Sequence, residues 1–312
     1  MQKVSMQHWQ GVWAKDRRGF EGDHVMQIGF IGVGLMGQGM VTRLLKAGHG
    51  VRVMAHRNRT PVEAVKAEGA TETGDAAALA QGAGVVILCV DNAETVAALI
   101  NSLKPHLKAG QIVIDTTTSD PRLTEALAKD LARQKVGLAD APMTGGPEQV
   151  AAGEAGALVG ADAATFATIA PVIGCYCARV HHFGEPGAGH RAKLISNYLV
   201  MGMIGVIADS YKAARQAGVD WGKLYDVQLL GSTNSGALKK MVGPALKGDY
   251  DGYRFSMVNA EKDMRYYCTL AESLGMLSPL AQETYRMFQA ASRHGGKNVS
   301  RLLDPSIEEQ QP

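Results

Sequence analysis

Lys193 and Asn197 lie four residues apart in the segment KLISN. This spacing places two side chains on one face of a helix, one turn apart. An ammonium group held there can protonate an oxygen atom that gains negative charge, which is how a general acid assists the reduction of a carbonyl group. A lysine near a helix start can equally extend its charge to solvent while its stem lies on apolar surface. The residue types alone leave both interpretations open.

The segment 192–218 predicts the helix that carries these two residues. It is apolar on most sides as far as Asp209, and Gly218 ends the pattern. Such a helix is expected to be buried between two domains. The segments 259–276 and 279–291 predict two further helices, which indicates an all-helical second domain packed over a crevice.

A glycine motif lies in the first half of the chain. The segment MQIGFIGVGLMGQGM begins as an apolar strand and then follows the pattern G-x-G-x-x-G. The chain contains 37 glycines, so a chance match is the alternative, but the strand before the motif and the helix after it favour a dinucleotide site. The glycines allow a tight turn, close approach of a pyrophosphate and close helix packing, and the first amides of the helix face an anion. The expected cofactor-binding residues here are Gly32, Gly34, Leu35, Met36 and Gly37.

The next strand, in the segment 50–60, ends where an acidic residue would bind the adenosine ribose of NAD. Arg57, Asn58 and Arg59 stand there instead. Guanidinium groups form paired hydrogen bonds with phosphate oxygens, so this set favours the 2′-phosphate of NADP. A solvated loop with ordinary arginines is the alternative.

Three more buried strands are predicted within 84–90, 111–118 and 136–143, with helix-like segments between them. This alternation is typical of a doubly wound α/β fold. Ligands in such folds bind beyond the carboxyl ends of the strands, so the residues that follow each strand should converge on one crevice. They are Asp91 and Asn92, then Thr117 and Thr118, then Thr144, Gly145 and Gly146. Asn92 and Val90, the last residue of its strand, are expected to bind the cofactor. Turn formation explains Asp91 and Asn92 as well as cofactor contact does.

Length and composition limit the classes of protein. A chain of 312 residues favours two domains, and 46% apolar with 20% charged residues is typical of a globular protein. We find no run of about eighteen apolar residues, so no membrane span is expected. The net charge of +2 is spread along the chain and favours no nucleic-acid partner. The four cysteines lack metal-ligand spacing, so reduced thiols in the cytoplasm and no metal are expected.

Residues 1–25 have mixed charges and lack the apolar core of an export signal. They are interpreted as a flexible leader or as the result of an upstream start codon. The expected division is a cofactor-binding domain over 26–186 and a helical domain over 187–312, which serves substrate binding and oligomerisation.

Four segments together resemble the β-hydroxyacid dehydrogenase family, from about residue 26 to the low 290s. GFIGVGLMGQGM resembles its cofactor fingerprint, and DAPMTGG its substrate-binding D-A-P-V-S-G-G. GAGHRAKLISN is similar to its G-x-G-x-x-x-K-x-x-N-N, and EKDM to its K-D-L. The order and spacing of all four are far more specific than a glycine motif alone. The family includes 3-hydroxyisobutyrate dehydrogenases and tartronate semialdehyde (2-hydroxy-3-oxopropionate), glyoxylate and succinic semialdehyde reductases.

The resemblance implies a role for each matching residue. Lys193 matches the catalytic lysine and Asn197 the asparagine one turn later. Thr144, with the two glycines after it, matches the loop that binds the substrate carboxylate. Thr118 matches a threonine beside the nicotinamide, and Lys262 a lysine near cofactor and substrate. Without the resemblance, Lys262 and Asp263 would be interpreted as a solvated ion pair on a helix face.

The sequence also departs from the family pattern. Thr144 replaces a serine and narrows the pocket by a methyl group, and Ser196 replaces the first of two asparagines. GEAGALVGAD is shorter than the family's G-x-L-x-x-M-V-G-G, and AHRNRTP is longer than N-R-T-P. These departures concern the substrate and the phosphate contact more than the reaction.

The function expected from the sequence is hydride transfer between NADP(H), in preference to NAD(H), and a small β-hydroxy acid or the corresponding aldehyde or oxo acid. Lys193 is the expected general acid and base, in a cytoplasmic homodimer or homotetramer. An imine-reductase-like enzyme is one alternative, although its relatives usually lack this lysine. A redox-inert NADP-binding protein for assembly or sensing is the other.

Overall fold

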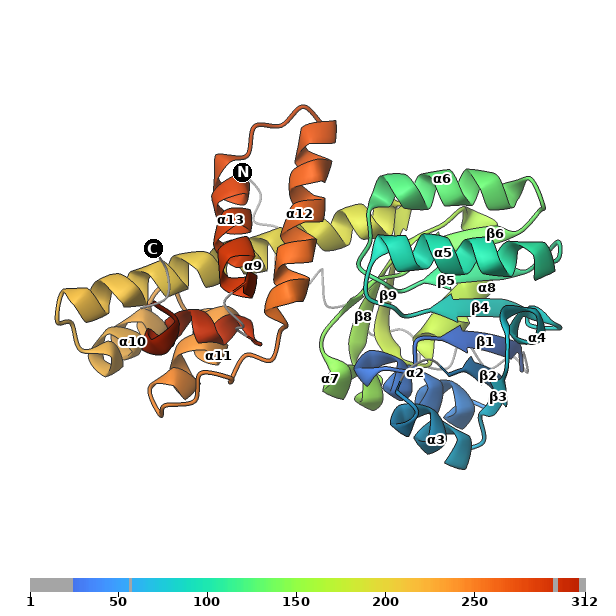
Figure 1. Ribbon diagram of the computed structural model, residues 1–312, viewed down its shortest axis with the longest axis horizontal. Coiled ribbons are helices and arrows are strands. Elements are labelled where there is room, and N and C mark those ends of the chain that lie inside the picture. The colour runs from blue at the N-terminus through green and yellow to red at the C-terminus, as the bar shows by residue number, and fades with distance from the viewer. Residues whose placement is uncertain (1–24, 56–57, 294–296, 309–312) are drawn as a thin grey trace, which may run out of the picture.

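The computed structural model describes residues 25–55, 58–293 and 297–308 (Figure 1). The leader expected at 1–25 lies almost wholly outside the described residues, and so does Arg57. Strand-rich and helix-only halves follow each other along the chain (Figure 1). The predicted fold class, a doubly wound α/β half followed by an all-helical half, is confirmed.

The first half forms a nine-stranded sheet with the order β3-β2-β1-β4-β5-β6-β8-β7, and β9 also pairs with β8. The first six strands are parallel, β8 runs antiparallel to β6 and β7, and β9 runs parallel to β8. The strands are β1 Gln27–Ile31, β2 Gly50–Met54, β3 Thr71–Thr73, β4 Val85–Leu88, β5 Ile112–Asp115, β6 Gly137–Asp140, β7 Met143–Thr144, β8 Ala155–Gly160 and β9 Cys177–Gly184. The order reverses between β1 and β4, which is where ligands of such sheets bind.

Helices cover both faces of this sheet because its central strands are buried on both sides (Figure 1). Met40 and Leu44 of α2 belong to the apolar core on one face, and Ile100 of α5 and Leu131 of α6 to the core on the other. The helices are α2 Leu35–Lys46, α3 Thr60–Ala67, α4 Ala76–Ala80, α5 Ala93–Leu103, α6 Pro121–Ala132, α7 Pro147–Ala152 and α8 Ala163–Gly174, with a 3-10 turn, η1, at Lys104–His106.

The second half is organised around α9, Ala188–Gln216, which runs from the sheet to the far end of the molecule (Figure 1). Leu194, Met201, Ile204, Ala208 and Tyr211 recur on one face of α9 and join a third apolar core. The other elements are α10 Trp221–Leu230, α11 Gly236–Ala245, α12 Met257–Ser273, α13 Pro279–Arg293, η2 Val299–Leu303 and α14 Pro305–Glu308. The sequence predicted α9, α12 and α13 to within a few residues, but not α10 or α11.

Length and composition alone would allow α9 to cross a membrane, and among the described residues it is the one helix of which this is true. This differs from the expectation that no segment is sufficiently apolar. In the fold α9 packs against β8 at its start and against α11, α12 and α13 further on. It therefore serves here as the core helix that joins the two halves.

Candidate active site

The glycine turn after β1 is fixed by close backbone contacts. Gly32 has φ of +100°, and a Cβ on it would lie 2.0 Å from the carbonyl oxygen of Cys89. A Cβ on Gly37 would lie 2.1 Å from the carbonyl oxygen of Gly32. A side chain on Gly32 would force the turn after β1 apart from the end of β4, and one on Gly37 would force α2 apart from the turn. The turn therefore lies against the point where the strand order reverses.

The start of α2 is open. Gly34 caps this helix without a side chain and is exposed. Apart from its two neighbours along the chain, no described residue has an atom within 4 Å of the position where a Cβ would lie. The amide of Gln38 is the first to bond within the helix, to the carbonyl of Gly34, so the amides of Leu35, Met36 and Gly37 precede the first intrahelical bond. Exposed amides at a helix N-terminus bind phosphate groups well. These residues therefore fit the pyrophosphate of a nicotinamide dinucleotide.

The loop after β2 contains the residues predicted to select NADP. Asn58 accepts a hydrogen bond from the amide of Thr60 over 3.1 Å and so forms a turn. The two terminal nitrogens of Arg59 donate to the two carboxylate oxygens of Glu72 at 3.0 Å each, and one also donates to Glu63 at 2.7 Å. Arg59 is thus already paired with two carboxylates. Arg57 lies outside the described residues.

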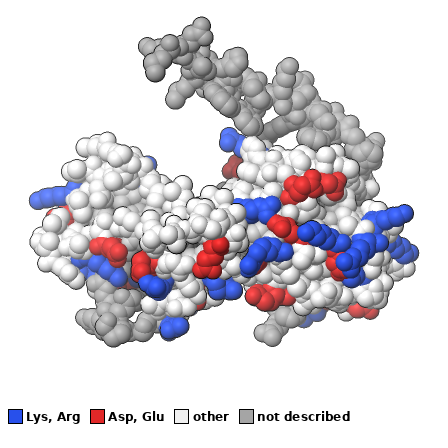
Figure 2. All heavy atoms as spheres, turned by 90° about the horizontal axis from the view of Figure 1, so that it is seen from above, with Lys and Arg blue, Asp and Glu red and all other residues white. Residues whose placement is uncertain are grey.

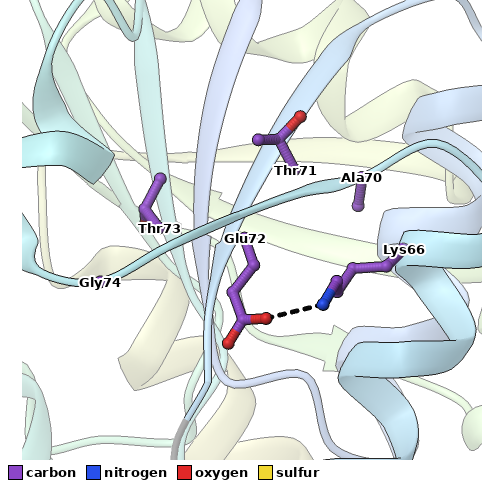
Figure 3. Close-up of a pocket in the computed structure, with 6 residues that line it drawn as sticks. All are labelled: Lys66, Ala70, Thr71, Glu72, Thr73 and Gly74. Carbon is purple, nitrogen blue, oxygen red and sulfur yellow. Dashed lines mark hydrogen bonds and ion pairs between the residues drawn. The ribbon is translucent and has the colours of Figure 1, made fainter.

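Glu72 also accepts from Lys66 over 2.9 Å (Figure 3). Its hydrogen bonds to Arg59 and Lys66 lower its pKa to about 2. The four side chains of Arg59, Lys66, Glu63 and Glu72 carry two positive and two negative charges, so they offer no net positive charge to a phosphate. Sequence reasoning missed Glu72. It lines a surface hollow formed by α3 and β3, at the edge of the sheet (Figure 3).

Two residues after β4 were predicted to bind the cofactor. The amide of Val90 donates to Oγ1 of Thr117 over 3.2 Å, which links the ends of β4 and β5. The side chain of Asn92 caps α5 by accepting from the amide of Thr95 over 2.8 Å. The turn-forming interpretation of Asn92 is therefore correct for its side chain, and its contact with a cofactor stays a prediction.

Lys262 holds the two strand ends from the helical half. Its ammonium group donates to the carbonyl of Asp91 over 2.8 Å and to the carbonyl of Thr118 over 2.9 Å. It also lies 3.4 Å from Oδ1 of Asp263. The interpretation of Lys262 and Asp263 as a solvated ion pair is wrong, because Asp263 is only 3% exposed. The structure thus brings Lys262 and Thr118 together, as the resemblance implied.

Asn197 and Asp263 form a buried pair between α9 and α12. The amide nitrogen of Asn197, which is 8% exposed, donates to Oδ2 of Asp263 over 2.7 Å. Burial raises the pKa of Asp263, against the opposing influence of Lys262, Lys193 and the hydrogen bond from Asn197. Sequence reasoning gave Asp263 no role at the site.

Lys193 lies one turn before Asn197 on α9. Desolvation lowers its pKa, the negative charge of Asp263 acts in the opposite direction, and the positive charge of Lys262 lowers it further. No described residue forms a hydrogen bond or an ion pair with the ammonium group of Lys193. The ammonium group of Lys262, by contrast, donates to two carbonyls. Lys193 is therefore a half-buried, desolvated amine whose protons remain available to a bound molecule.

The loop from Thr144 to Gly146 connects β7 to α7. Gly145 has φ of +101°, which favours glycine, and Thr144 is exposed with its hydroxyl 3.4 Å from the carbonyl of Gly156. The amide of Gly146 is already bound to Oε1 of Gln149 over 2.8 Å. Of the three groups expected to face a carboxylate, the amide of Gly145 has no partner among the described residues, and the hydroxyl of Thr144 donates only a long hydrogen bond of 3.4 Å to Gly156.

The strand order, the open start of α2 at the strand reversal and the desolvated amine on the joining helix define a class. The protein is an NAD(P)-dependent oxidoreductase with a Rossmann domain followed by a helical domain. Comparisons with known proteins narrow this class.

Residues 27–184 match the model of the NAD binding domain of 6-phosphogluconate dehydrogenase, and residues 187–303 match that of the NAD-binding domain of NADP-dependent 3-hydroxyisobutyrate dehydrogenase. The L-threonate dehydrogenase of Cupriavidus necator is 30% identical over 90% of this chain and 97% of its own. The structure of 3-hydroxyisobutyrate dehydrogenase from Mycobacterium tuberculosis with L-serine superposes with a TM-score of 0.81 at 23% identity, over 92% of this chain and all of that one (100%). Psf3 in complex with NADP+ and 2-OPP superposes with a TM-score of 0.77 at 25% identity, over 88% of this chain and 98% of that one.

The chain belongs to the β-hydroxyacid dehydrogenase family, and it is an NAD(P)-dependent dehydrogenase that acts on CH–OH groups.

Proposed function

We propose that this protein catalyses reversible hydride transfer between NADP(H) and a small β-hydroxy acid or the corresponding aldehyde or oxo acid, with Lys193 as general acid and base. The observation that carries the proposal is the desolvated ammonium group of Lys193, which has no hydrogen-bond or ion-pair partner within the described part of the chain and lies one turn from Asn197 on the helix that joins the two halves. A merely snorkelling lysine would have its charge in solvent, and its pKa would not be lowered by burial.

When bound, the nicotinamide supplies or accepts the hydride at the substrate carbon. In the reduction direction, Lys193 donates a proton to the carbonyl oxygen as negative charge develops there. In the oxidation direction the neutral amine of Lys193 takes the proton of the hydroxyl group. An ordinary lysine pKa of about 10.4 would leave little neutral amine near pH 7, so the lowered pKa of Lys193 serves this direction.

The other residues orient the reacting groups. Asn197, fixed by Asp263, is a neutral hydrogen-bonding group beside the substrate oxygen. The hydroxyl of Thr144 and the amide of Gly145 bind the substrate carboxylate, which requires no counter-charge. Gly146 contributes only to the conformation of the loop, because its amide already donates a hydrogen bond to the side chain of Gln149. Lys262 and Thr118 shape the nicotinamide end of the cofactor site, with Val90 and Asn92 at its edge.

The preference for NADP(H) rests on the loop after β2, which has Arg57, Asn58 and Arg59 and lacks the acid that binds a ribose hydroxyl. Psf3, a structural relative, is described with NADP+ bound. To bind the phosphate, Arg59 has to release Glu72. Their ion pair is exposed to solvent, so its loss costs little free energy.

The assembly proposed is a homodimer or homotetramer in the cytoplasm. Ile195, Leu199 and Val206 are 55%, 66% and 57% exposed and recur at spacings of four and seven residues on one face of α9. An apolar stripe of this kind on a helix is typical of a surface that another copy covers. The cofactor domain proposed is 26–186, and 187–312 serves substrate binding and assembly, with 1–25 as a leader.

A substrate screen tests the proposed reaction. L-threonate, 3-hydroxyisobutyrate and 2-(hydroxymethyl)glutarate, which relatives are named for oxidising, are each incubated with NADP+ and with NAD+. Formation of the reduced nicotinamide from at least one of them is expected. Reduction of an imine from cyclohexanone and allylamine is the control reaction. Turnover of the imine without turnover of any hydroxy acid would contradict the proposal.

A further inference from the structure

His190 lies in the first turn of α9 and is completely buried. Its Nδ1 lies 2.8 Å from the hydroxyl of Thr124 on α6, and its Nε2 lies 2.8 Å from the carbonyl oxygen of Thr117 after β5. A carbonyl oxygen can only accept, so Nε2 carries the proton and donates it to Thr117. A single imidazole thus connects α9 to two elements of the sheet half.

The backbone at the same helix start is held by Asp140 at the end of β6. One carboxylate oxygen accepts from the amide of Gly187 and the other from the amide of His190, each over 2.6 Å. A carboxylate at a helix N-terminus also interacts favourably with the helix dipole. A Cβ on Gly189 would lie 2.2 Å from the carbonyl of Leu158 on β8, so the helix start rests directly on the sheet. The depth and the rotation of α9 are therefore fixed here.

The contacts of His190 affect the candidate active site because His190 adjoins two parts of it, the helix that carries Lys193 and the segment that contains Thr118. Lys193 follows His190 by three residues, which places it on the next turn of the same helix face. Thr117 precedes Thr118, whose carbonyl is bound by Lys262. The imidazole therefore joins the segment that is to face the nicotinamide to the helix that carries the proton donor.

We propose that His190 is a positioning residue, whose hydrogen bond from Nε2 to the carbonyl of Thr117 sets the distance between Lys193 and the strand end beside the nicotinamide. The inference rests on the proposed role of Lys193. The competing explanation is a buried histidine that only fills the core with its polar atoms satisfied. The two explanations differ in whether the Thr117 bond matters more for turnover than the Thr124 bond.

A matched pair of variants separates the two hydrogen bonds. In His190→Gln the amide nitrogen takes the place of Nε2 and still reaches Thr117, whereas in His190→Asn the shorter amide reaches only toward Thr124. Thr124→Val is the control, because it removes the Nδ1 partner and keeps the shape. A displacement of about 1 Å at a reacting group can cost on the order of 100-fold in rate. We expect kcat to fall roughly 10- to 100-fold in His190→Asn and less than about fivefold in the other two.

The KM of the hydroxy acid with the highest turnover in the screen should change little in His190→Asn, and so should the Kd of NADP+, since neither binding site contains His190. Equal losses of kcat in His190→Asn and Thr124→Val, or an equally large loss in His190→Gln, would overturn the inference. Asp140→Asn is the second variant if His190→Asn does not fold, and the same loss of kcat at unchanged KM is expected for it.

Chemical labelling tests the inference without a substrate. Acetic anhydride acetylates the neutral form of an amine. Lys193, whose pKa is lowered by desolvation, should therefore react readily in the parent protein. It should react several-fold more slowly in His190→Asn, where the loosened helix start lets water reach the amine, as measured by mass spectrometry relative to Lys104. Unchanged labelling would also overturn the inference. Lys193→Ala is included in the kinetic series, so that normal turnover in it identifies a failure of the proposed function rather than of the role of His190.

Discussion

The amide nitrogen of Asn197 donates a hydrogen bond to Oδ2 of Asp263 over 2.7 Å and so ties α9 to α12 one turn after Lys193. The bond fixes a buried carboxylate near the proposed proton donor. Desolvation lowers the pKa of Lys193, and the charge of Asp263 opposes this change. The pair thereby determines how far below its ordinary value the amine titrates.

Replacement of Asp263 by Asn should shift the pH dependence of substrate oxidation. Lys193 has to be neutral in this direction, so kcat rises with pH through its pKa. The carboxylate raises that pKa, and Lys262, the other charged group that acts on Lys193, lowers it. Loss of the carboxylate should therefore move the rising limb to lower pH, by on the order of one unit. Measurement of kcat against pH with saturating substrate checks the direction.

Glu261→Gln, on the same helix, is the control for this shift, because Glu261 pairs with Ser292 and does not act on Lys193. If the rising part of the kcat–pH profile stayed in place or moved to higher pH in Asp263→Asn, the carboxylate would not raise the pKa of Lys193.

Gly34→Ala should weaken cofactor binding and leave the fold intact. The backbone of Gly34 has φ of −99°, and no described residue other than its two chain neighbours has an atom within 4 Å of the added methyl group. The methyl group would instead meet the pyrophosphate at the open start of α2. We expect the Kd of NADP+ to rise about tenfold or more at an unchanged Tm. Gly236→Ala, at the start of α11 and equally open, is the control for the change of residue type. Unchanged binding in Gly34→Ala would place the pyrophosphate elsewhere.

The cofactor preference should depend on both Arg59 and Glu72. Loss of a charge-assisted contact costs about 1.5 to 3 kcal/mol, so the parent protein should bind NADP+ at least about tenfold more tightly than NAD+. The double variant Arg57→Ala, Arg59→Ala should lose this preference. Glu72→Gln removes the carboxylate that competes for Arg59 and should tighten NADP+ binding several-fold.

Titration of both cofactors measures these effects, and NAD+ binding to Glu72→Gln is the internal control, because NAD+ lacks the 2′-phosphate. Equal affinity of the parent protein for the two cofactors would contradict the preference. Unchanged NADP+ binding in Glu72→Gln would show that Arg59 does not bind the phosphate.

The apolar stripe on α9 predicts the assembly state. Sedimentation at micromolar concentration should give a dimer or a tetramer of the 33.1 kDa chain. Leu199→Lys should shift the distribution toward the monomer, because it places a charge in the middle of the covered surface. Phe183→Lys on β9, where the side chain is also exposed, should not. A parent protein that sediments as a single 33.1 kDa species would contradict the proposed assembly.

The elements that the sequence predicted are those whose cause is local. A Cβ on Gly32 or Gly37 would lie 2.0 or 2.1 Å from a backbone carbonyl oxygen, which excludes every side chain, so the motif predicted both the turn and its place. The long apolar pattern of 192–218 predicted α9, which spans Ala188–Gln216. Both signals lie within one continuous segment.

The features that were missed depend on contacts between distant segments. The strand β8, AGALVG, is composed mainly of small residues, and four of the eight residues of β9 are exposed, so neither segment has the apolar pattern of a buried strand. Glu72 reaches Arg59 from a three-residue strand. The roles of Asp263 and His190 depend on partners 66 and 73 residues away along the chain. In the sequence, an acid beside a lysine on a predicted helix indicates an exposed ion pair, and only the packing of the helices shows that Asp263 is buried.

The kcat of Lys193→Ala with saturating NADP+ and hydroxy acid is the most direct measurement of the proposed chemistry. The variant should fold and bind NADP+ as the parent does, since Lys193 lies outside the glycine turn, while kcat falls by at least ~10²- to 10⁴-fold. Lys212→Ala, further along the same helix, is the matched control and should retain parental turnover. If Lys193→Ala retained near-parental kcat, Lys193 would not be the proton donor, and the helix would carry a half-buried amine without a catalytic role.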